Sequence, residues 1–294
     1  SQLITIDGKV MAVAFMANTQ HLYVRTDVLK ANGIAIPKTY EEVVAASEKI
    51  RAAGKMKYPY AAAYKAGWNL AEEFVNMYIG HGGEFFEAGS AKPSINNAKG
   101  VATLNMLKKL ADLSNPDYLT HDSEAIKVEW EAGNVAIMTL WASRSGTLLD
   151  DEGDAKITAA TKLVAPATVG GGNIPAATLW WDGFTLAKNR PDADAEASFR
   201  AMAHAASSKE MVAKASDQAV WLVEGFVPGP KSVGVIEAVK MGAKPYPMLP
   251  QMGLMHGALG NEIVEFLQGN ETAEQALKDV EAAYNTKAKE QGFL

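Results

Sequence analysis

The stretch that decides the fold runs from Asp7 to Leu29 and reads DGKVMAVAFMANTQHLYVRTDVL. It is apolar over residues 10–16, polar over 18–21 and apolar again over 22–24. A continuous apolar run of this length predicts a strand that is buried on both faces. An unpaired polar group in the interior costs about 1–3 kcal/mol, so the polar middle must lie in a wet crevice or cross between two separately packed bodies. A loop between two strands of one sheet fits the stretch equally well.

Size and composition describe an ordinary folded protein. The chain has 294 residues, enough for two domains of roughly 150 residues each. A net charge of −6 without a basic stripe argues against a nucleic-acid partner, which needs clustered Lys and Arg. No apolar run approaches the ~20 residues that span a bilayer. The absence of cysteine excludes disulfides and thiolate metal sites.

Strands and helices alternate along the rest of the chain, which predicts an α/β protein with largely parallel sheets. Thr39 and Glu42 have the spacing of a capping box at a helix start, and so do Thr272 and Gln275. Helices are expected over 39–54, 70–79, 123–130, 193–207, 209–216, 258–267 and 272–290 and after residue 96, and strands over 58–64, 135–140 and 177–187.

Signatures of catalysis are absent from the sequence. It contains no G-x-S-x-G elbow, no H-E-x-x-H pair and no P-loop. The five histidines are scattered without the spacing of metal ligands. A glycosidase-type pair of carboxylates can be proposed, but the sequence does not single out which two. The expectation is therefore a protein without catalytic residues, metal or cofactor.

Tryptophans stand where the predicted strands end. Trp68, Trp141, Trp180 and Trp181 each lie near a junction between strand and loop, beside polar residues. Ligands of open α/β sheets gather at the carboxyl ends of strands. An indole covers the C–H face of a sugar, and Asn, Gln, Asp or Arg side chains bind its hydroxyls. Packing in the core is the alternative for any one of them, but Trp180 and Trp181 are neighbours and must face opposite sides of a strand.

The sequence resembles the family 1 extracellular solute-binding proteins of bacterial ABC transporters, the group that includes maltose-binding protein. The resemblance covers essentially the whole chain, and the order of the matching pieces carries it. These pieces are DGKV at 7–10, PKTYEE at 37–42, AGNVAIM at 132–138, FTLAKN at 184–189, PQM at 250–252 and EQALKDV at 274–280.

The resemblance implies a two-lobe periplasmic-binding-protein fold (type II-like) of the α/β class, with hinge strands between the lobes. Its crossings would be Asn18–His21 and Leu179–Gly183. The first lobe would comprise residues 1–18 and 184–236, and the second 19–183 and 237–294. Family members carry a further portion before the segment that matches Asp7, so the first lobe is expected to be incomplete.

The resemblance also implies positions for a ligand. Trp141 matches an aromatic platform, Trp68 an aromatic contact and Asn18 a polar contact, while His256 falls where the maltose-binding group has a stacking tryptophan. Arg144 is either an exposed cation or a contact for an acidic or sulfonated sugar. The expected ligand-binding residues are Asn18, Gln20, Trp68, Trp141, Arg144, Trp180, Trp181, Asp182 and His256.

The function implied is that of the substrate-binding component of an ABC importer, not an enzyme. It would close its lobes on a sugar, oligosaccharide or polyol and deliver it to the permease subunits. It would act as a monomer in the periplasm or tethered by lipid outside the cell, although no signal peptide is visible in the chain. The alternatives are an α/β carbohydrate-active enzyme with a carboxylate pair in its cleft, and a receptor for a non-sugar solute on the same fold.

Overall fold

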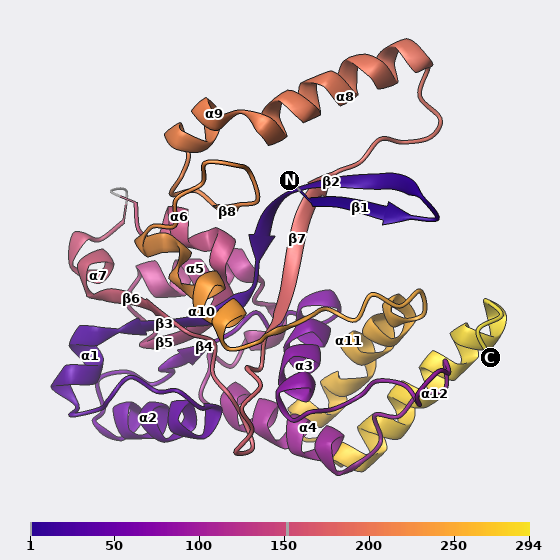
Figure 1. Cartoon of the computed structure of the whole chain (residues 1–294). Helices are drawn as coiled ribbons and strands as arrows, with labels where there is room; N and C mark the ends of the chain where they lie inside the picture. Colours follow the sequence, from indigo (N-terminus) through magenta and orange to yellow (C-terminus); the bar gives the residue numbers. More distant parts are fainter. Residues whose placement is uncertain (1, 151–152) are drawn as a thin grey trace.

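The computed structural model describes residues 2–150 and 153–294. Figure 1 shows an arm built on one sheet above a larger body built on another. In the arm, β2 (Lys9–Asn18) pairs with β1 (Gln2–Ile6), β7 (Thr178–Phe184) and β8 (Val220–Trp221), and β7 pairs with β9 (Lys244–Pro245). In the body, β3 (Gln20–Arg25) lies between β5 (Ile137–Trp141) and β6 (Thr161–Val164), and β4 (Tyr60–Ala61) pairs with β5.

The expectation of largely parallel sheets is wrong. Among the described residues, five of the seven strand pairings are antiparallel, and only β4 with β5 and β7 with β9 run parallel. The reason is that the chain does not return to a neighbouring strand through each helix. Instead, it runs straight from one sheet into the other, and long connections bring later strands back in the opposite direction.

The helices follow the predicted pattern, and the expected strand over 58–64 shortens to β4. Thr39 Oγ1 accepts a hydrogen bond from Glu42 N (3.1 Å) at the start of α2, whereas the Glu42 carboxylate accepts from Lys38 N and not from the capping residue. The helices are α1 (Thr26–Ala31), α2 (Tyr40–Ala52), α3 (Trp68–Gly80), α4 (Ala98–Ala111), α5 (Ser123–Glu131), α6 (Ser145–Leu148), α7 (Ala155–Ala160), α8 (Asp192–Ser207), α9 (Lys209–Lys214), α10 (Val233–Lys240), α11 (Met252–Gln268) and α12 (Ala273–Glu290).

The main hydrophobic core lies in the body. Helices α3, α4, α11 and α12 pack on one another at the lower right of Figure 1, and their apolar faces join the residues of the lower sheet in one cluster. Phe74 of α3, Leu104 of α4, Leu259 of α11 and Tyr284 of α12 are all fully buried there. This packing holds the first turn of α3 and the start of α11 against each other.

The arm is more open than the sequence predicts. Its β1–β2 hairpin turns at Asp7 and Gly8, whose φ angles of 49° and 73° suit a two-residue turn. Val10 and Met11 are 52% and 53% exposed, so the expectation that this apolar run is buried on both faces is wrong. Ala12 and Ala14 are buried, and α8 lies over β2 (Figure 1), so only part of the strand is covered.

The polar middle of the opening stretch passes between the two sheets. Thr19, the single residue between β2 and β3, is fully buried. Its Oγ1 donates to Thr178 O (2.8 Å), and its carbonyl accepts from Ala142 N (2.8 Å). The residues at 18–21 are all buried, so this is a dry crossing between two sheets and neither a wet crevice nor a loop within one sheet.

A glycine allows α10 to lie against the crossing. The His21 ring stacks on Tyr23 with centroids 4.4 Å apart, and its other side faces Gly234. A Cβ on Gly234 would lie 1.9 Å from His21 Cδ2, far inside van der Waals contact. Because His21 is itself buried, the ring has little room to move. The small residue is therefore required for α10 to cover β3.

We predict that Gly234→Ala destabilises the protein by about 1–3 kcal/mol, because the added methyl overpacks the His21 ring. The matched control is Gly257→Ala on the exposed side of α11, where a Cβ would meet no atom within 4 Å. This control should stabilise by roughly 0.5–1 kcal/mol through helix propensity. Urea unfolding measures both, and a neutral Gly234→Ala would contradict the packing described.

Candidate ligand-binding site

Three tryptophans far apart in the sequence meet where α3, β5 and β7 come together. Ring centroids of Trp68 and Trp141 are 6.2 Å apart, those of Trp68 and Trp180 5.7 Å, and those of Trp141 and Trp180 6.0 Å. Tyr246 lies 4.4 Å from Trp180, and His256 lies 4.9 Å from Trp68. We call these five residues the aromatic cluster. Trp68 is 50% exposed, so the cluster presents an apolar surface to solvent.

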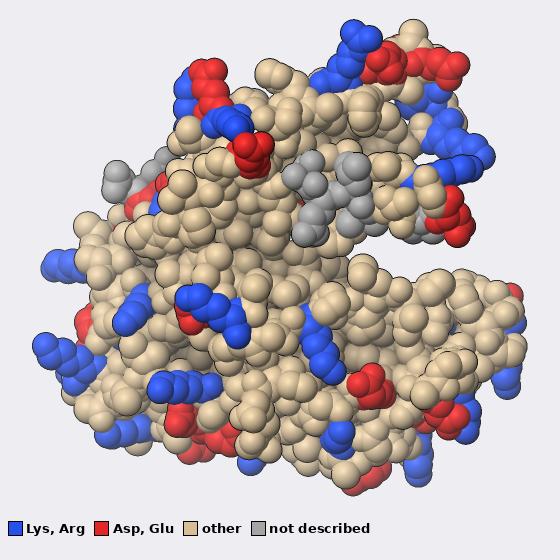
Figure 2. Space-filling model, in the orientation of Figure 1, with Lys and Arg blue, Asp and Glu red and all other residues tan. Residues whose placement is uncertain are grey.

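The surface beside this cluster is hollowed. Figure 2 shows an open notch between the arm, which carries α8 and the β1–β2 hairpin, and the layer of α11 and α12 below it. Figure 1, in the same orientation, shows β7 running between the body and the arm. Because β7 contacts α3, the aromatic cluster lies where the strand that joins the two sheets meets the body.

The indole of Trp180 is anchored from within. Its Nε1 lies 2.8 Å from Thr178 Oγ1 and 3.1 Å from Glu72 Oε1. Thr178 Oγ1 is also 2.7 Å from Asn76 Oδ1. Burial raises the pKa of the Glu72 carboxyl to about 8, against the lowering effect of the hydrogen bonds from Thr178 and Trp180. The orientation of this ring is therefore set before any ligand arrives.

His256 supports Trp68 from behind. Its Nε2 is 3.0 Å from the Trp68 carbonyl oxygen, and its Nδ1 is 2.9 Å from the Tyr246 hydroxyl. A carbonyl oxygen only accepts, so Nε2 carries the proton and Nδ1 accepts from the tyrosine. Burial lowers the pKa of His256, so the imidazole stays neutral in this arrangement. The ring is buried and its two nitrogens are used inside the protein.

Two further expected ligand contacts, Asn18 and Gln20, have their amides engaged within the protein. Asn18 Oδ1 accepts from Ser143 N (3.1 Å), and its Nδ2 donates to Ser143 Oγ (3.2 Å). Gln20 Oε1 accepts from Asn76 Nδ2 (3.2 Å). These contacts tie the first crossing to the end of β5 and to α3. Both residues lie directly beneath the site.

The remaining expected residues are placed differently. Trp181 faces away from Trp180 on β7, with its ring against Gly183. Asp182 is exposed on the Trp180 side of β7, and partial burial of its carboxyl raises its pKa. Arg144 forms an ion pair with Glu124 at the surface. The structure thus gathers Trp68, Trp141, Trp180 and His256 and leaves Trp181 and Arg144 outside the cluster.

Sequence reasoning missed three residues of the site. Tyr246 stands in the proline-rich piece before α11, and that aromatic between two prolines was its only signal. Glu72 and Thr178 give no signal at all in the sequence, because a glutamate in a helix and a threonine before a strand are ordinary. Their role follows from the contact of α3 with β7.

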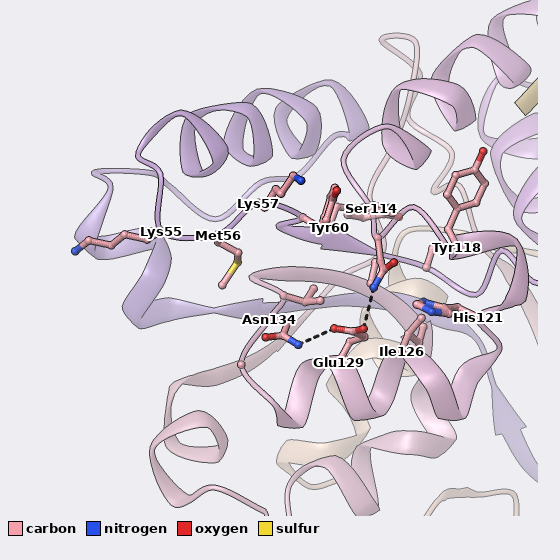
Figure 3. Close-up of a pocket in the computed structure, with 16 residues that line it drawn as sticks. Lys55, Met56, Lys57, Tyr60, Ser114, Tyr118, His121, Ile126, Glu129 and Asn134 are labelled. Atoms are coloured by element: carbon pink, nitrogen blue, oxygen red, sulfur yellow. Dashed lines mark hydrogen bonds between the residues drawn. The ribbon is translucent and has the colours of Figure 1, made fainter. Parts of the chain in front are cut away.

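A second hollow lies at the other end of β5. Figure 3 shows this pocket, of about 270 Å³, which includes Tyr60, Tyr118, His121 and Glu129. Asn115 Nδ2 and Asn134 Nδ2 donate to the two oxygens of Glu129 at 3.1 and 2.8 Å, so this carboxylate is already satisfied by the protein. The pocket shares no residue with the aromatic cluster.

Within residues 2–150 and 153–294, no group of three or more His, Cys, Asp or Glu side chains is placed to hold a metal ion. None of the helices in the same ranges combines the length and apolarity that crossing a membrane requires.

The fold and the notch define a two-lobe binding protein of the α/β class. Residues 1–245 match the family model described as bacterial extracellular solute-binding protein, and the chain belongs to this family. The family and fold predicted from the sequence are therefore confirmed. The division of the chain into lobes at the stated residues stays a prediction.

Two curated relatives are similar over part of their length. A probable ABC transporter-binding protein of Deinococcus radiodurans is 32% identical over 193 residues, which are 63% of this chain and 44% of that protein. A probable amino-acid ABC transporter periplasmic-binding protein of Sinorhizobium fredii is 30% identical over 128 residues, 42% of this chain and 29% of that protein. The matched part thus spans less than half of each relative.

Solved structures share the fold at low sequence identity. The maltose-bound MalE3 of T. maritima has a TM-score of 0.82 at 20% identity, covering 96% of this chain and 74% of that one. An ABC transporter solute-binding protein of Agrobacterium radiobacter in complex with ribitol has a TM-score of 0.80 at 19% identity, covering 97% and 73%.

We predict that His256→Phe destabilises the protein by roughly 1–3 kcal/mol, because it removes the two hydrogen bonds that the buried His256 ring makes with the Trp68 carbonyl and the Tyr246 hydroxyl. The pKa of His256 is lower in the folded protein than in the unfolded chain. As pH falls below about 6.5, His256 therefore takes up a proton more readily in the unfolded chain than in the folded protein. The contribution of neutral His256 to the free energy of unfolding is lost over this range of pH.

The measurement is urea unfolding of both proteins between pH 5 and 7.5. The deficit of the variant should be largest at pH 7.5 and shrink towards pH 5. His204→Gln on the exposed side of α8 serves as the control and should leave the pH profile unchanged. A deficit that is constant with pH would contradict the assignment of a neutral His256.

Proposed function

We propose that the chain is the substrate-binding component of an ABC importer for a neutral sugar, oligosaccharide or polyol. The observation that carries the proposal is the surface of Trp68, Trp141 and Trp180 beside the notch. Indole faces cover the C–H faces of sugar rings, and a sugar brings little charge to such a surface. Membership of the extracellular solute-binding family supports a role in solute capture.

The ligands bound to the structural relatives belong to this class. They are maltose in the T. maritima protein, ribitol in the A. radiobacter protein and D-mannitol in a protein of Agrobacterium vitis. The D. radiodurans relative is a probable ABC transporter-binding protein. We propose by extension a periplasmic or lipid-tethered monomer that delivers its ligand to permease subunits.

The proposed mechanism is hinge closure with a shift of population towards the closed form. The chain passes between the sheets at Thr19, and Thr178 at the start of β7 lies against that point. Rotation about these residues moves the arm towards the aromatic cluster and leaves the core of the body packed. A ligand that contacts both bodies binds the closed form better and therefore stabilises it.

A neutral solute suits the charges around the cluster better than an acidic one. The guanidinium of Arg144 is paired with Glu124. Asp182 is an exposed carboxyl on the Trp180 side of β7, and its charge disfavours an approaching anion. These observations weigh against the acidic or sulfonated sugar that Arg144 left open.

A receptor for amino acids is the second candidate, because the S. fredii relative is described as an amino-acid binding protein. Such a ligand needs a cation or a set of amide donors for its carboxylate. The aromatic cluster offers neither, which favours a sugar. A carbohydrate-active enzyme is disfavoured because Glu72 and Glu73 are buried side by side on α3 and do not face each other across a cleft.

We predict that a panel of monosaccharides, disaccharides and polyols contains a solute that raises the thermal stability of the protein. At 100-fold above its dissociation constant the ligand adds about 2.7 kcal/mol. Trp180→Ala and Trp68→Ala should each weaken that binding about tenfold or more, a loss of about 1.4 kcal/mol. Calorimetric titration measures the affinities.

Phe199→Ala, which truncates an exposed aromatic on α8 away from the cluster, is the matched control and should bind as the parent does. Stabilisation by amino acids alone would replace the sugar proposal with the second candidate. If Trp180→Ala binds the sugar with the affinity of the parent, the aromatic surface is not part of the binding site.

We predict that Arg144→Ala leaves affinity for neutral solutes within about twofold and changes stability by less than about 1 kcal/mol, because its ion pair with Glu124 is solvent-exposed. The same titrations against a neutral sugar and its uronic acid measure the effect. Tight binding of the uronic acid that disappears in the variant would make Arg144 a ligand contact after all.

A further inference from the structure

Two neighbouring carboxyls lie in the interior directly behind the aromatic cluster. Glu72 and Glu73 of α3 are 0% and 3% exposed. Within the described ranges, the ion pairs of the molecule include neither of them. One oxygen of each, Glu72 Oε2 and Glu73 Oε1, has no hydrogen-bond partner. Burying an unpaired carboxylate is costly, so such groups retain a proton instead.

A chain of hydrogen bonds joins the two carboxyls. Glu72 Oε1 lies 2.8 Å from Thr178 Oγ1, which lies 2.7 Å from Asn76 Oδ1. Asn76 Nδ2 lies 3.2 Å from Gln20 Oε1, and the Gln20 amide hydrogen-bonds Glu73. We call Glu72, Thr178, Asn76, Gln20 and Glu73 the relay. Trp180 Nε1 donates into it at Thr178 and Glu72.

Counting protons shows what the relay requires. The Thr178 hydroxyl has one proton but contacts two oxygens, those of Glu72 and Asn76. If Thr178 donates to Asn76, the Glu72 carboxyl must carry the proton of the other contact. If Thr178 donates to Glu72, the side-chain amides of Asn76 and Gln20 must each rotate by about 180° so that every contact still pairs a donor with an acceptor. The Gln20 amide oxygen then faces Glu73, and Glu73 must be protonated to donate to it. The relay is complete only with a proton at one end.

We propose that Glu72 and Glu73 are positioning residues that keep at least one proton on the relay, and that this protonation holds Trp180 in the orientation that the ligand needs. The inference rests on the proposed function for its effect on binding, but not for the relay itself. Gln20 and Thr178 belong to the two strands that meet at the crossing, so the relay also ties α3 to both.

Loss of this protonation has a defined consequence. With both carboxyls ionised, the single proton of the Thr178 hydroxyl cannot serve both of its contacts, so one of them brings two oxygens together without a hydrogen bond. Two negative charges also lie close together in the interior. Thr178 and the Trp180 indole must then move. Burial raises the pKa of Glu72 and of Glu73 to about 8, so this change falls in an accessible range of pH.

The other titratable groups around the relay do not change charge in that range. Tyr246, from the segment before α11, faces Glu72, and Tyr40, Tyr60 and Tyr64 face Glu73. Burial raises the pKa of all four phenols above its usual value. Burial lowers the pKa of His256 on α11 and of His21 on β3, so both imidazoles are neutral there.

Asp182, on the same side of β7 as Trp180, has a raised pKa but is exposed, and its ionisation requires no rearrangement of the relay.

The experiment follows the tryptophan emission of the ligand-free protein from pH 5 to 10. A single transition with a midpoint near 8 is expected in the parent. It should be absent from Glu72→Gln, whose amide donates to Thr178 at every pH, and from Glu73→Gln, whose amide donates to Gln20. The matched control, Glu48→Gln on the exposed side of α2, should keep the transition.

A second readout needs no variant. The infrared band of protonated carboxylic acid in the parent should be present at pH 7 and disappear around pH 8, so the test survives if either variant does not fold. A parent emission that is flat over the whole range, or a transition that persists in both Gln variants, would overturn the relay. So would the absence of the protonated band at pH 7.

Binding is then titrated at pH 7 and 9 with the neutral sugar or polyol that stabilises the parent most. Affinity of the parent should fall about tenfold at one pH unit above the midpoint, and the affinity of Glu72→Gln should stay constant. Affinity that does not change with pH in the parent would overturn the link to the site. If the parent shows the pH transition in tryptophan emission but binds no solute of the panel, the relay is supported and the proposed function is contradicted.

Discussion

The structure depends on one buried threonine. Thr19 is the single residue between the two sheets, and its hydroxyl and carbonyl are satisfied by Thr178 from β7 and by Ala142, directly after β5. An unsatisfied hydroxyl or amide at this depth would cost about 1–3 kcal/mol, so the three segments must meet at this point. Because they meet there, Trp141 and Trp180, one residue before Ala142 and two residues after Thr178, come to lie side by side.

The candidate site is a consequence of that meeting. Each segment alone is an ordinary strand or helix, and no segment carries more than two of the aromatic residues. The helical layer of the body adds Trp68 and His256 because α3 and α11 pack against each other beside β7. A site assembled at the crossing is sensitive to the angle between the two bodies, which is the property that capture by hinge closure uses.

The interior beneath the site is polar, and this is unusual for a core. Gln20, Thr178 and three residues of α3, Glu72, Glu73 and Asn76, are buried where the crossing strands meet α3. A polar network of this kind is stable only when its members are satisfied, and it then specifies a unique geometry. The same network that orients Trp180 thus also fixes the register of the two strands.

Much of the architecture was readable from the sequence. Apolar spacing and caps at Thr39 and Thr272 predicted the helices. The polar interruption at 18–21 left a crossing and a loop equally open, and the family resemblance predicted the crossing. Strand direction was not readable, because alternation of strands and helices does not say which strands become neighbours. Burial of 10–16 was predicted wrongly for a related reason, since apolar composition does not say whether another layer covers the strand.

By itself, the sequence determined the α/β class, the family and the order of the elements. The prediction that the tryptophans stand at strand ends holds only for Trp141, because Trp68 begins α3 and Trp180 and Trp181 lie within β7. Only the tertiary structure decided which tryptophans meet, that His256 supports Trp68 from behind, and that Glu72 lies under Trp180. The physical reason is distance along the chain. Local patterns follow from neighbours three or four residues apart, whereas Glu72 and Thr178 are 106 residues apart and touch only because the two bodies share one buried crossing.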